Sequence, residues 1–145
     1  MFSKTCEYGI RAVIYISATA SHENKIGITE ISTNIEAPVH FTAKILQTLG
    51  HNNIVSSQKG VNGGFYMDKY QKQTRLIDVV RAIDGDALFS GCGLGLKQCS
   101  EEEPCPLHDK FKAIRNNLKK MMEQTNIDEM AKMLNKGRRF LRIEE

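Results

Sequence analysis

The chain has 145 residues, of which 41% are hydrophobic, and a formal net charge of +3. This length suits one domain, or a compact domain with an appended helix, and no run of eighteen apolar residues predicts a transmembrane helix. Glu7 and Arg11 interrupt the apolar stretch near the start, which does not fit a signal peptide. We therefore expect a mature helix there, and a cytoplasmic protein with no membrane partner.

The charged residues are unevenly distributed along the chain. Residues 1–75 carry eight Lys or Arg and five Asp or Glu, residues 76–108 carry two and six, and residues 109–145 carry ten and six. An anionic partner such as nucleic acid is expected to meet the two basic ends rather than the acidic middle.

The first half of the chain predicts three helices. The first covers residues 7–20, and the second covers 28–35, in which isoleucines recur at spacings of three and four. A third helix starts at Pro38, because proline suits a helix start but not its interior. Its apolar stripe comprises Phe41, Ile45, Leu46 and Leu49, and the Asn52-Asn53 pair supplies left-handed stopping points.

Residues 54–67 predict a β-hairpin, because two short apolar–polar runs flank a loop with three glycines. A compact helix capped by Thr74 follows. Further on, two one-faced helices are expected over residues 109–124 and 125–137. The apolar stripe of the longer helix, Phe111, Ile114, Leu118 and Met121, needs a cover, for which a second copy of the chain is the simplest candidate.

Two short helices followed by a hairpin with a glycine-rich tip predict a winged helix-turn-helix within a mainly α fold. In this arrangement the second helix enters the major groove and the hairpin tip lies beside a phosphate or in the minor groove. The candidate DNA-binding residues are His40, Thr42, Lys44, Gln47, Lys59, Asn62 and Gly63. Of these, Thr42 and Gln47 are expected to read base edges or phosphates, and the two lysines to contact phosphate. The competing interpretation is that these are ordinary solvated faces of a small domain.

Three of the four cysteines fall within residues 92–105, in the pattern Cys92-x6-Cys99-x5-Cys105-x2-His108. Thiolates are soft ligands for iron–sulfur clusters and zinc, and imidazole suits both. Zinc knuckles usually space their cysteines more closely, so the long gaps favour a cluster with several iron positions. Zinc, a thiol-only redox switch and free thiols in a disordered loop are the alternatives.

The hairpin motif KGVNGGF followed by this cysteine loop resembles the Rrf2 family of bacterial transcription regulators, over about residues 4–135. The resemblance implies a homodimer with a dimerisation helix near 108–123, a two-fold symmetric DNA operator, and Cys92, Cys99 and Cys105 as ligands of an iron–sulfur cluster. His108 matches the fourth ligand of the [2Fe-2S] members. Glu7 lies near the place where [4Fe-4S] members use an acidic residue of the other subunit.

We favour His108 and a [2Fe-2S] cluster, although the first cysteine gap is six residues rather than the family's usual five. The competing interpretations are a solvated carboxylate for Glu7 and a metal-free helix-start residue for His108. Three parts are predicted: a DNA-binding domain over 1–84, a cluster-binding loop over 85–107, and a dimerisation helix with a C-terminal helix and tail over 108–145.

The predicted function is a DNA-binding transcriptional regulator whose operator affinity is controlled by the cluster. A zinc- or thiol-dependent regulator of the same fold is the alternative. An iron–sulfur enzyme is the rival from another class, but the chain lacks a G-x-G-x-x-G fingerprint after a strand and a local nucleophile–base motif. We therefore expect no enzymatic activity.

Overall fold

The computed structural model describes residues 1–137 and 139–142 of the chain. The elements are α1 (Lys4–Thr19), α2 (Ile28–Ile35), α3 (Val39–His51), β1 (Ser56–Gln58), β2 (Gly64–Tyr66), α4 (Lys69–Lys72), α5 (Leu76–Asp84), α6 (Ala87–Ser90), α7 (His108–Gln124) and α8 (Ile127–Asn135). The predicted mainly helical fold with one hairpin is confirmed. The predicted C-terminal tail lies partly outside the described residues.

Helix α1 is the central element, and it contacts α2, α3, α5 and α8. Ser3 caps it, because the Ser3 side chain accepts a hydrogen bond of 3.0 Å from the Cys6 backbone N–H. The buried side of α1 packs with the apolar faces of α2 and α3. This main core includes Val13, Ile16, Ile31, Ile35, Leu46 and Leu49.

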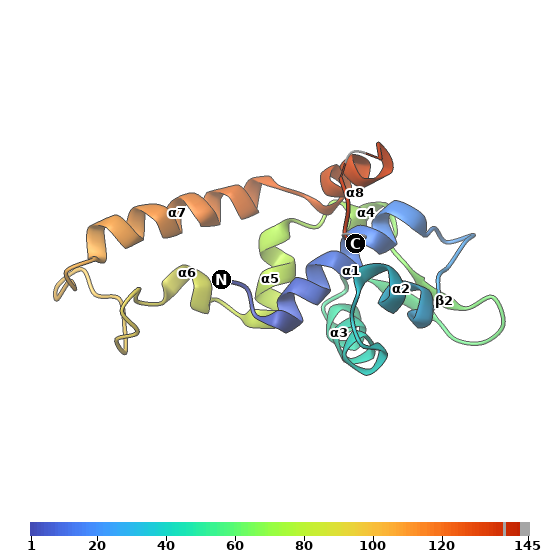
Figure 1. Cartoon of the computed structure of the whole chain (residues 1–145), viewed down its shortest axis with the longest axis horizontal. Coiled ribbons are helices and arrows are strands. Elements are labelled where there is room, and N and C mark those ends of the chain that lie inside the picture. Colours follow the sequence, from blue (N-terminus) through green and yellow to red (C-terminus); the bar gives the residue numbers. More distant parts are fainter. Residues whose placement is uncertain (138, 143–145) are drawn as a thin grey trace.

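A second apolar cluster joins α1, α5, α6 and α7. Its buried members are Cys6, Leu76, Ile77, Val80, Phe89 and Met122. Met122 lies near the end of α7, so this end of the helix is held on the body. The rest of α7 extends away from the body, with residues 91–107 at its far end (Figure 1).

The helix pair α2–α3 turns sharply at Glu36, whose left-handed backbone (φ 55°) ends α2. Pro38 then precedes the first residue of α3, as its fixed φ favours. Asn53 takes the left-handed conformation (φ 57°) after α3, and the Ile54 N–H donates to the Leu49 carbonyl at 2.9 Å. The predicted stop at the asparagine pair is therefore confirmed.

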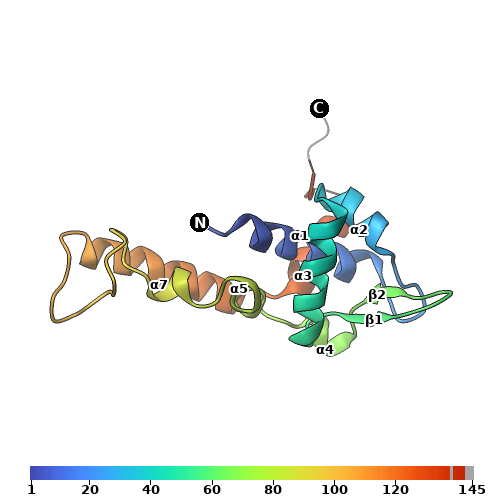
Figure 2. The ribbon, with the colours of Figure 1, turned by 90° about the horizontal axis from the view of Figure 1, so that it is seen from below.

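The hairpin pairs β1 and β2 antiparallel, with Ser57 opposite Phe65. Phe65 also forms a bridge with Ile26, which ties the hairpin to the segment before α2. Gly64 allows this approach, because a β-carbon there would lie 2.6 Å from the Ile26 carbonyl oxygen. The hairpin and the far end of α7 project from opposite ends of the molecule in both views (Figure 2).

The start of α5 differs from the prediction. Arg75, not Thr74, precedes the first turn, and no side chain caps it. The Thr74 carbonyl instead accepts from the Ile127 N–H at 3.0 Å, and the Leu76 N–H donates to the Thr125 carbonyl at 2.8 Å. The segment between α7 and α8 thus pairs with the start of α5.

Candidate functional site

The outer face of α3 carries a polar stripe of exposed residues. His40, Lys44 and Gln47 lie on it, as predicted, and His51 continues it one turn later. Spacings of four, three and four residues place all four side chains on one face of a helix. The sequence prediction omitted His51, although the same spacing identifies it.

Thr42 does not belong to this stripe, and its predicted contact with DNA is wrong. Its side chain is 0% exposed, and its hydroxyl donates to the Pro38 carbonyl at 3.0 Å. Phe41, predicted to be buried, is 45% exposed, with its ring 4.4 Å from the His40 ring. The buried stripe of α3 therefore contains Thr42 in place of Phe41, and the Thr42 hydroxyl is satisfied there by its backbone partner.

The hairpin tip holds the other predicted DNA-binding residues. Lys59 is exposed immediately after β1, and Asn62 takes a left-handed backbone conformation (φ 63°). A β-carbon at Gly63 would collide with the Gln58 carbonyl, so the tight turn requires glycine. The tip therefore presents a cation and a compact backbone to an approaching ligand.

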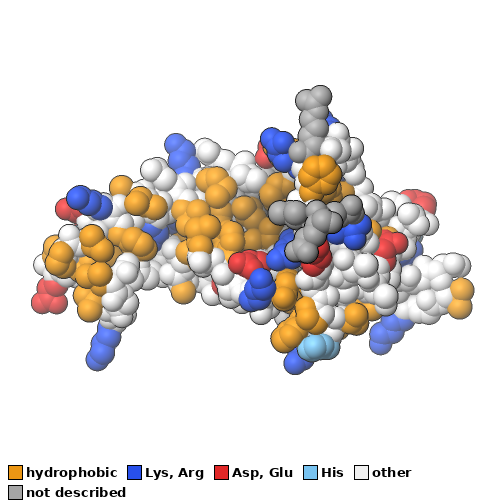
Figure 3. Space-filling view, in the orientation of Figure 1, with side chains coloured by type: hydrophobic (Ala, Val, Ile, Leu, Met, Phe, Trp, Pro, Cys, Tyr) orange, Lys and Arg blue, Asp and Glu red, His pale blue; other side chains and the backbone are white. Residues whose placement is uncertain are grey.

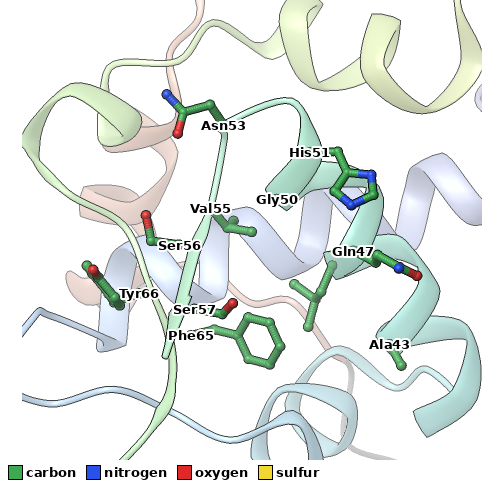
Figure 4. A pocket seen from close by; sticks show the side chains of 11 residues that line it. Ala43, Gln47, Gly50, His51, Asn53, Val55, Ser56, Ser57, Phe65 and Tyr66 are labelled. Atoms are coloured by element: carbon green, nitrogen blue, oxygen red, sulfur yellow. The ribbon is translucent and has the colours of Figure 1, made fainter. Parts of the chain in front are cut away.

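A groove of about 590 Å³ lies between α3 and the two strands (Figure 4). Gln47 and His51 line it from α3, and Ser57, Phe65 and Tyr66 line it from the hairpin. The groove connects the polar stripe of α3 with the hairpin.

The cysteine loop, which we define as residues 91–107, brings its ligand-type side chains together in two pairs. The Cys92 and Cys105 sulfurs are 4.0 Å apart, and the Cys99 sulfur is 3.4 Å from His108 Nδ1. His108 is the first residue of α7 and only 5% exposed. The four predicted ligands therefore form two contacting pairs, Cys92 with Cys105 and Cys99 with His108.

Two observations bear on how these pairs could hold a metal. Ligands about 2.0–2.3 Å from one tetrahedral metal are separated by about 3.3–3.8 Å, close to the separations in both pairs. Among the described residues, however, no group of three or more His, Cys, Asp or Glu side chains is arranged to hold one metal ion. Each pair therefore has the spacing of two ligands of one metal atom.

The environment of Cys92 favours its thiolate form. The Leu94 backbone N–H donates to the Cys92 sulfur at 3.4 Å. Hydrogen bonds from the backbone of Leu94, then Leu96, and from the Cys105 side chain lower the pKa of Cys92. Thiolates are the form of cysteine that binds metals and attacks disulfides.

Four contacts hold the cysteine loop against α7. Arg115 Nη1 donates to the Gly91 carbonyl at 2.8 Å, and Gly93 packs against the ring of Phe111. Glu101 forms an ion pair with Lys112, and its other carboxylate oxygen lies 3.3 Å from His108 Nε2. These contacts connect the loop to the first two turns of α7.

Within one chain, Glu7 does not join the loop ligands. Its carboxylate pairs with Lys4 Nζ at 3.3 Å on the first turn of α1. The neighbouring Cys6 is fully buried, and burial, followed by the effect of Asp84, raises the pKa of its thiol to about 12. Cys6 is therefore a core residue.

A helix pair with an exposed polar stripe, followed by a hairpin wing, defines a winged helix-turn-helix protein of the DNA-binding regulator class. The chain belongs to the Rrf2 family, described as iron-dependent transcriptional regulators, whose model matches residues 2–133. The family and the relatives below are transcriptional regulators and not enzymes. None of the described helices is both long and apolar enough to cross a membrane.

Sequence relatives lie at low identity over most of the chain. An HTH-type transcriptional regulator of Aquifex aeolicus is 25% identical over 132 residues, which covers 90% of each chain. The HTH-type transcriptional regulator IscR of Pectobacterium atrosepticum is 20% identical over 123 residues, or 85% of this chain and 74% of the relative.

Solved structures share the fold. CymR, the global cysteine regulator of B. subtilis, superposes with a TM-score of 0.76 at 18% identity, covering 92% of this chain and 97% of CymR. IscR of T. potens superposes with a TM-score of 0.74 at 13% identity, covering 96% and 91%.

Proposed function

We propose that the protein binds a two-fold symmetric DNA operator as a homodimer, and that an iron–sulfur cluster on Cys92, Cys99, Cys105 and His108 controls its operator affinity. The observation that carries the proposal is the pairing of these four side chains, with the imidazole of His108 buried at the start of α7. Two donor pairs favour a [2Fe-2S] over a [4Fe-4S] cluster. We place the regulator in the cytoplasm, where thiols stay reduced.

The exposed face of α7 supports the homodimer. Only His108 and Met122 of this helix are buried, while Phe111, Ile114 and Met121 are 37%, 66% and 45% exposed. Hydrophobic side chains gather along α7 on the face shown in Figure 3. A second α7 packed on this face would remove these side chains from water. It would also fix the distance between the α3 helices of the two subunits, which must be about 34 Å for both to read their half-sites.

The contacts between the loop and α7 support the control step. When bound, a cluster supplies a group that oxidants, nitric oxide or iron shortage can alter or remove. Four ligand side chains held in one place fix the loop at the start of α7. When they are free, the contacts of Gly91, Gly93 and Glu101 with the helix remain. Whether the loop is fixed or free thereby affects the tilt of α7. Typical coupling between two sites, here the cluster site and the DNA-binding surface, changes the affinity for DNA about 5- to 150-fold.

A cluster-free thiol switch is the second candidate. The Cys92 and Cys105 sulfurs, 4.0 Å apart, need a shift of about 2 Å to reach the length of a disulfide. The fold likeness includes Staphylococcus aureus CymR in an oxidized form, which keeps this candidate open. A zinc site is less well supported, because the donors form two pairs rather than one tetrahedral set.

The first experiment is anaerobic purification followed by an absorption spectrum and by iron and sulfide analysis. We expect visible bands and about two irons and two sulfides per chain, with both lost in Cys92→Ala and reduced in His108→Ala. Cys6→Ala, in the core, is the matched control and should keep the iron. Colourless protein without iron after reconstitution would overturn the cluster. A Cys92–Cys105 disulfide formed when this protein is then exposed to air, with dioxygen accepting the two electrons, would support the thiol switch.

A further inference from the structure

Glu101 makes a contact in the cysteine loop that the proposed function does not yet use. Its carboxylate lies between Lys112 and one ring nitrogen of His108, Nε2. We propose that Glu101 is a positioning residue: it accepts a hydrogen bond from Nε2–H of His108 and thereby leaves Nδ1, which faces Cys99, as the nitrogen that binds the cluster. This inference rests on the proposed cluster site and adds the residue that selects the ligand atom of the histidine.

The two ring nitrogens of His108 face different partners. Nδ1 is 3.4 Å from the Cys99 sulfur, and Nε2 is 3.3 Å from one carboxylate oxygen of Glu101. A neutral imidazole carries one proton, and only the nitrogen without it can donate an electron pair to a metal. If Nδ1 binds the cluster beside Cys99, the proton is on Nε2, where Glu101 lies.

Burial makes a partner for Nε2 necessary. The imidazole is buried at the start of α7, and Nε2 has no hydrogen bond of good geometry to any described residue. A buried N–H group without a partner is unfavourable. The Glu101 side chain is 67% exposed, so it can rotate to align its oxygen with Nε2–H without moving the core.

Two features hold Glu101 in place. Lys112 of α7 forms an ion pair with the other carboxylate oxygen. The Ser100 hydroxyl accepts from the backbone N–H groups of Glu102 and Glu103 at 3.2 and 3.1 Å, which forms a local turn around residue 101. An ionised carboxylate accepts hydrogen bonds and donates none, so from this position it favours a proton on Nε2.

A carboxylate at the second nitrogen of a histidine ligand has two known effects. It fixes the orientation of the ring and raises its basicity, and loss of such a partner typically weakens metal binding about 10- to 100-fold. Because Glu101 belongs to the loop and His108 to α7, the contact also links the orientation of one ligand to the position of the loop.

The first test uses metal-free protein, so that it does not depend on the cluster. Isotopically labelled full-length protein is reduced and treated with a chelator at pH 8, and long-range proton–nitrogen correlation spectra show which ring nitrogen carries the proton. The signals of His108 are those absent from His108→Ala. We expect the proton on Nε2 in the wild type and a mixture of both tautomers in Glu101→Ala, where the Cys99 sulfur competes as an acceptor for Nδ1–H. A proton on Nδ1 of the wild type, alone or together with Nε2, would overturn the inference.

The second test uses the protein with its cluster. Iron loss to an excess of chelator should be about 10-fold faster in Glu101→Ala than in the wild type. The reduction potential should rise, because the imidazole becomes a weaker electron donor. Glu101→Gln keeps an oxygen acceptor without the charge and should fall between the two in both measurements.

Two controls separate positioning of the histidine from simple attachment of the loop. Glu102→Ala removes a neighbouring negative charge but keeps the contact with His108, and it should behave as the wild type. Lys112→Ala breaks the ion pair with α7 but keeps the carboxylate, and it should keep the proton on Nε2. If Lys112→Ala and Glu101→Ala change the tautomer equally, Glu101 only attaches the loop and the inference is wrong.

Failure of the inference and failure of the proposed function give different results. If the wild-type protein binds neither iron nor sulfide, the proposed function fails and Glu101 positions no ligand. If the cluster binds but Glu101→Ala changes neither the tautomer nor the rate of iron loss, the cluster site stands and the inference alone fails.

Discussion

Gly93 lies flat against the ring of Phe111, so a β-carbon at Gly93 would be 2.8 Å from two ring atoms. Residue 93 belongs to the cysteine loop and residue 111 to the first turn of α7. This contact therefore requires both an aromatic ring on the helix and the absence of a side chain on the loop.

We predict that Gly93→Ala separates the loop from α7 while leaving the DNA-binding body folded. The added methyl must displace the ring or the loop, and such overpacking typically costs about 1–3 kcal/mol. Hydrogen exchange of residues 91–99 should become faster than in the wild type, and iron content should fall. Gly27→Ala is the control, because nothing lies within 4 Å of its β-carbon. Unchanged exchange in the loop would contradict the prediction.

A second prediction concerns the reactivity of the thiols. In reduced protein treated with a chelator, iodoacetamide at pH 8 should modify Cys92 quickly and Cys6 only after unfolding. The lowered pKa of Cys92 favours its reactive thiolate, whereas Cys6 is buried and has a pKa raised from 9.0 to about 12. Peptide mass spectrometry after timed pulses measures both rates. Equal rates for the two cysteines in folded protein would disprove the assignment of Cys6 to the core.

The same burial predicts a loss of stability in alkali. The Cys6 thiol ionises near pH 9 when the chain is unfolded but only near pH 12 when it is folded. The unfolded state therefore binds fewer protons between these values, and the free energy of unfolding falls as the pH rises from 9 toward 12. Urea titrations of wild type and Cys6→Ala across this range isolate the contribution, which should be absent in the variant.

We predict that Ile114→Glu yields a folded monomer. Ile114 is 66% exposed in the single chain, so a carboxylate there does not disturb the core but would be buried in a dimer interface. Sedimentation velocity should show the mass of one chain, with unchanged helical circular dichroism. Asn116→Glu, on the opposite side of α7, should remain dimeric. A dimeric Ile114→Glu variant would place the interface elsewhere.

Lys59→Ala should weaken DNA binding without changing sequence preference. A lysine that neutralises one phosphate contributes about 0.9 to the slope of log affinity against log salt. Loss of two lysines from a dimer should therefore reduce this slope by about 1.8. Lys136→Ala, at the end of α8, should leave the slope unchanged. If Lys59→Ala alters base preference with no change in slope, Lys59 reads bases instead.

Periodicity predicted the helices of the DNA-binding region well, because their apolar positions are regular. The predicted bounds of α2, 28–35, agree with the structure. The error at Thr42 has a physical cause: hydrophobicity ranks phenylalanine above threonine, but a threonine hydroxyl bonded to the Pro38 carbonyl is fully compatible with burial. Packing against the neighbouring helices determines which side of α3 is buried, and the pattern within one helix carries no information about that packing.

The cysteine spacing predicted a ligand-binding loop but not its internal arrangement. Cys92 lies beside Cys105 and Cys99 beside His108, whereas the order along the chain gives no reason to prefer this pairing. The pairing depends on how the loop folds back on α7 through Gly91, Gly93 and Glu101. Such contacts between distant residues have no periodic signal.

The hydrogen bonds between the α7–α8 segment and the start of α5 fix one end of α7 on the body, so that any tilt of the helix moves its other end most. Thr125 holds one end of the helix to the body, and His108 is at the other end. At 1.5 Å per residue, the 17 residues of α7 span about 25 Å, so a rotation of about 10° at the Thr125 pivot moves His108 by about 4 Å. On the proposed function, a small rearrangement among the four proposed ligands would therefore tilt α7 about its attachment to the DNA-binding body.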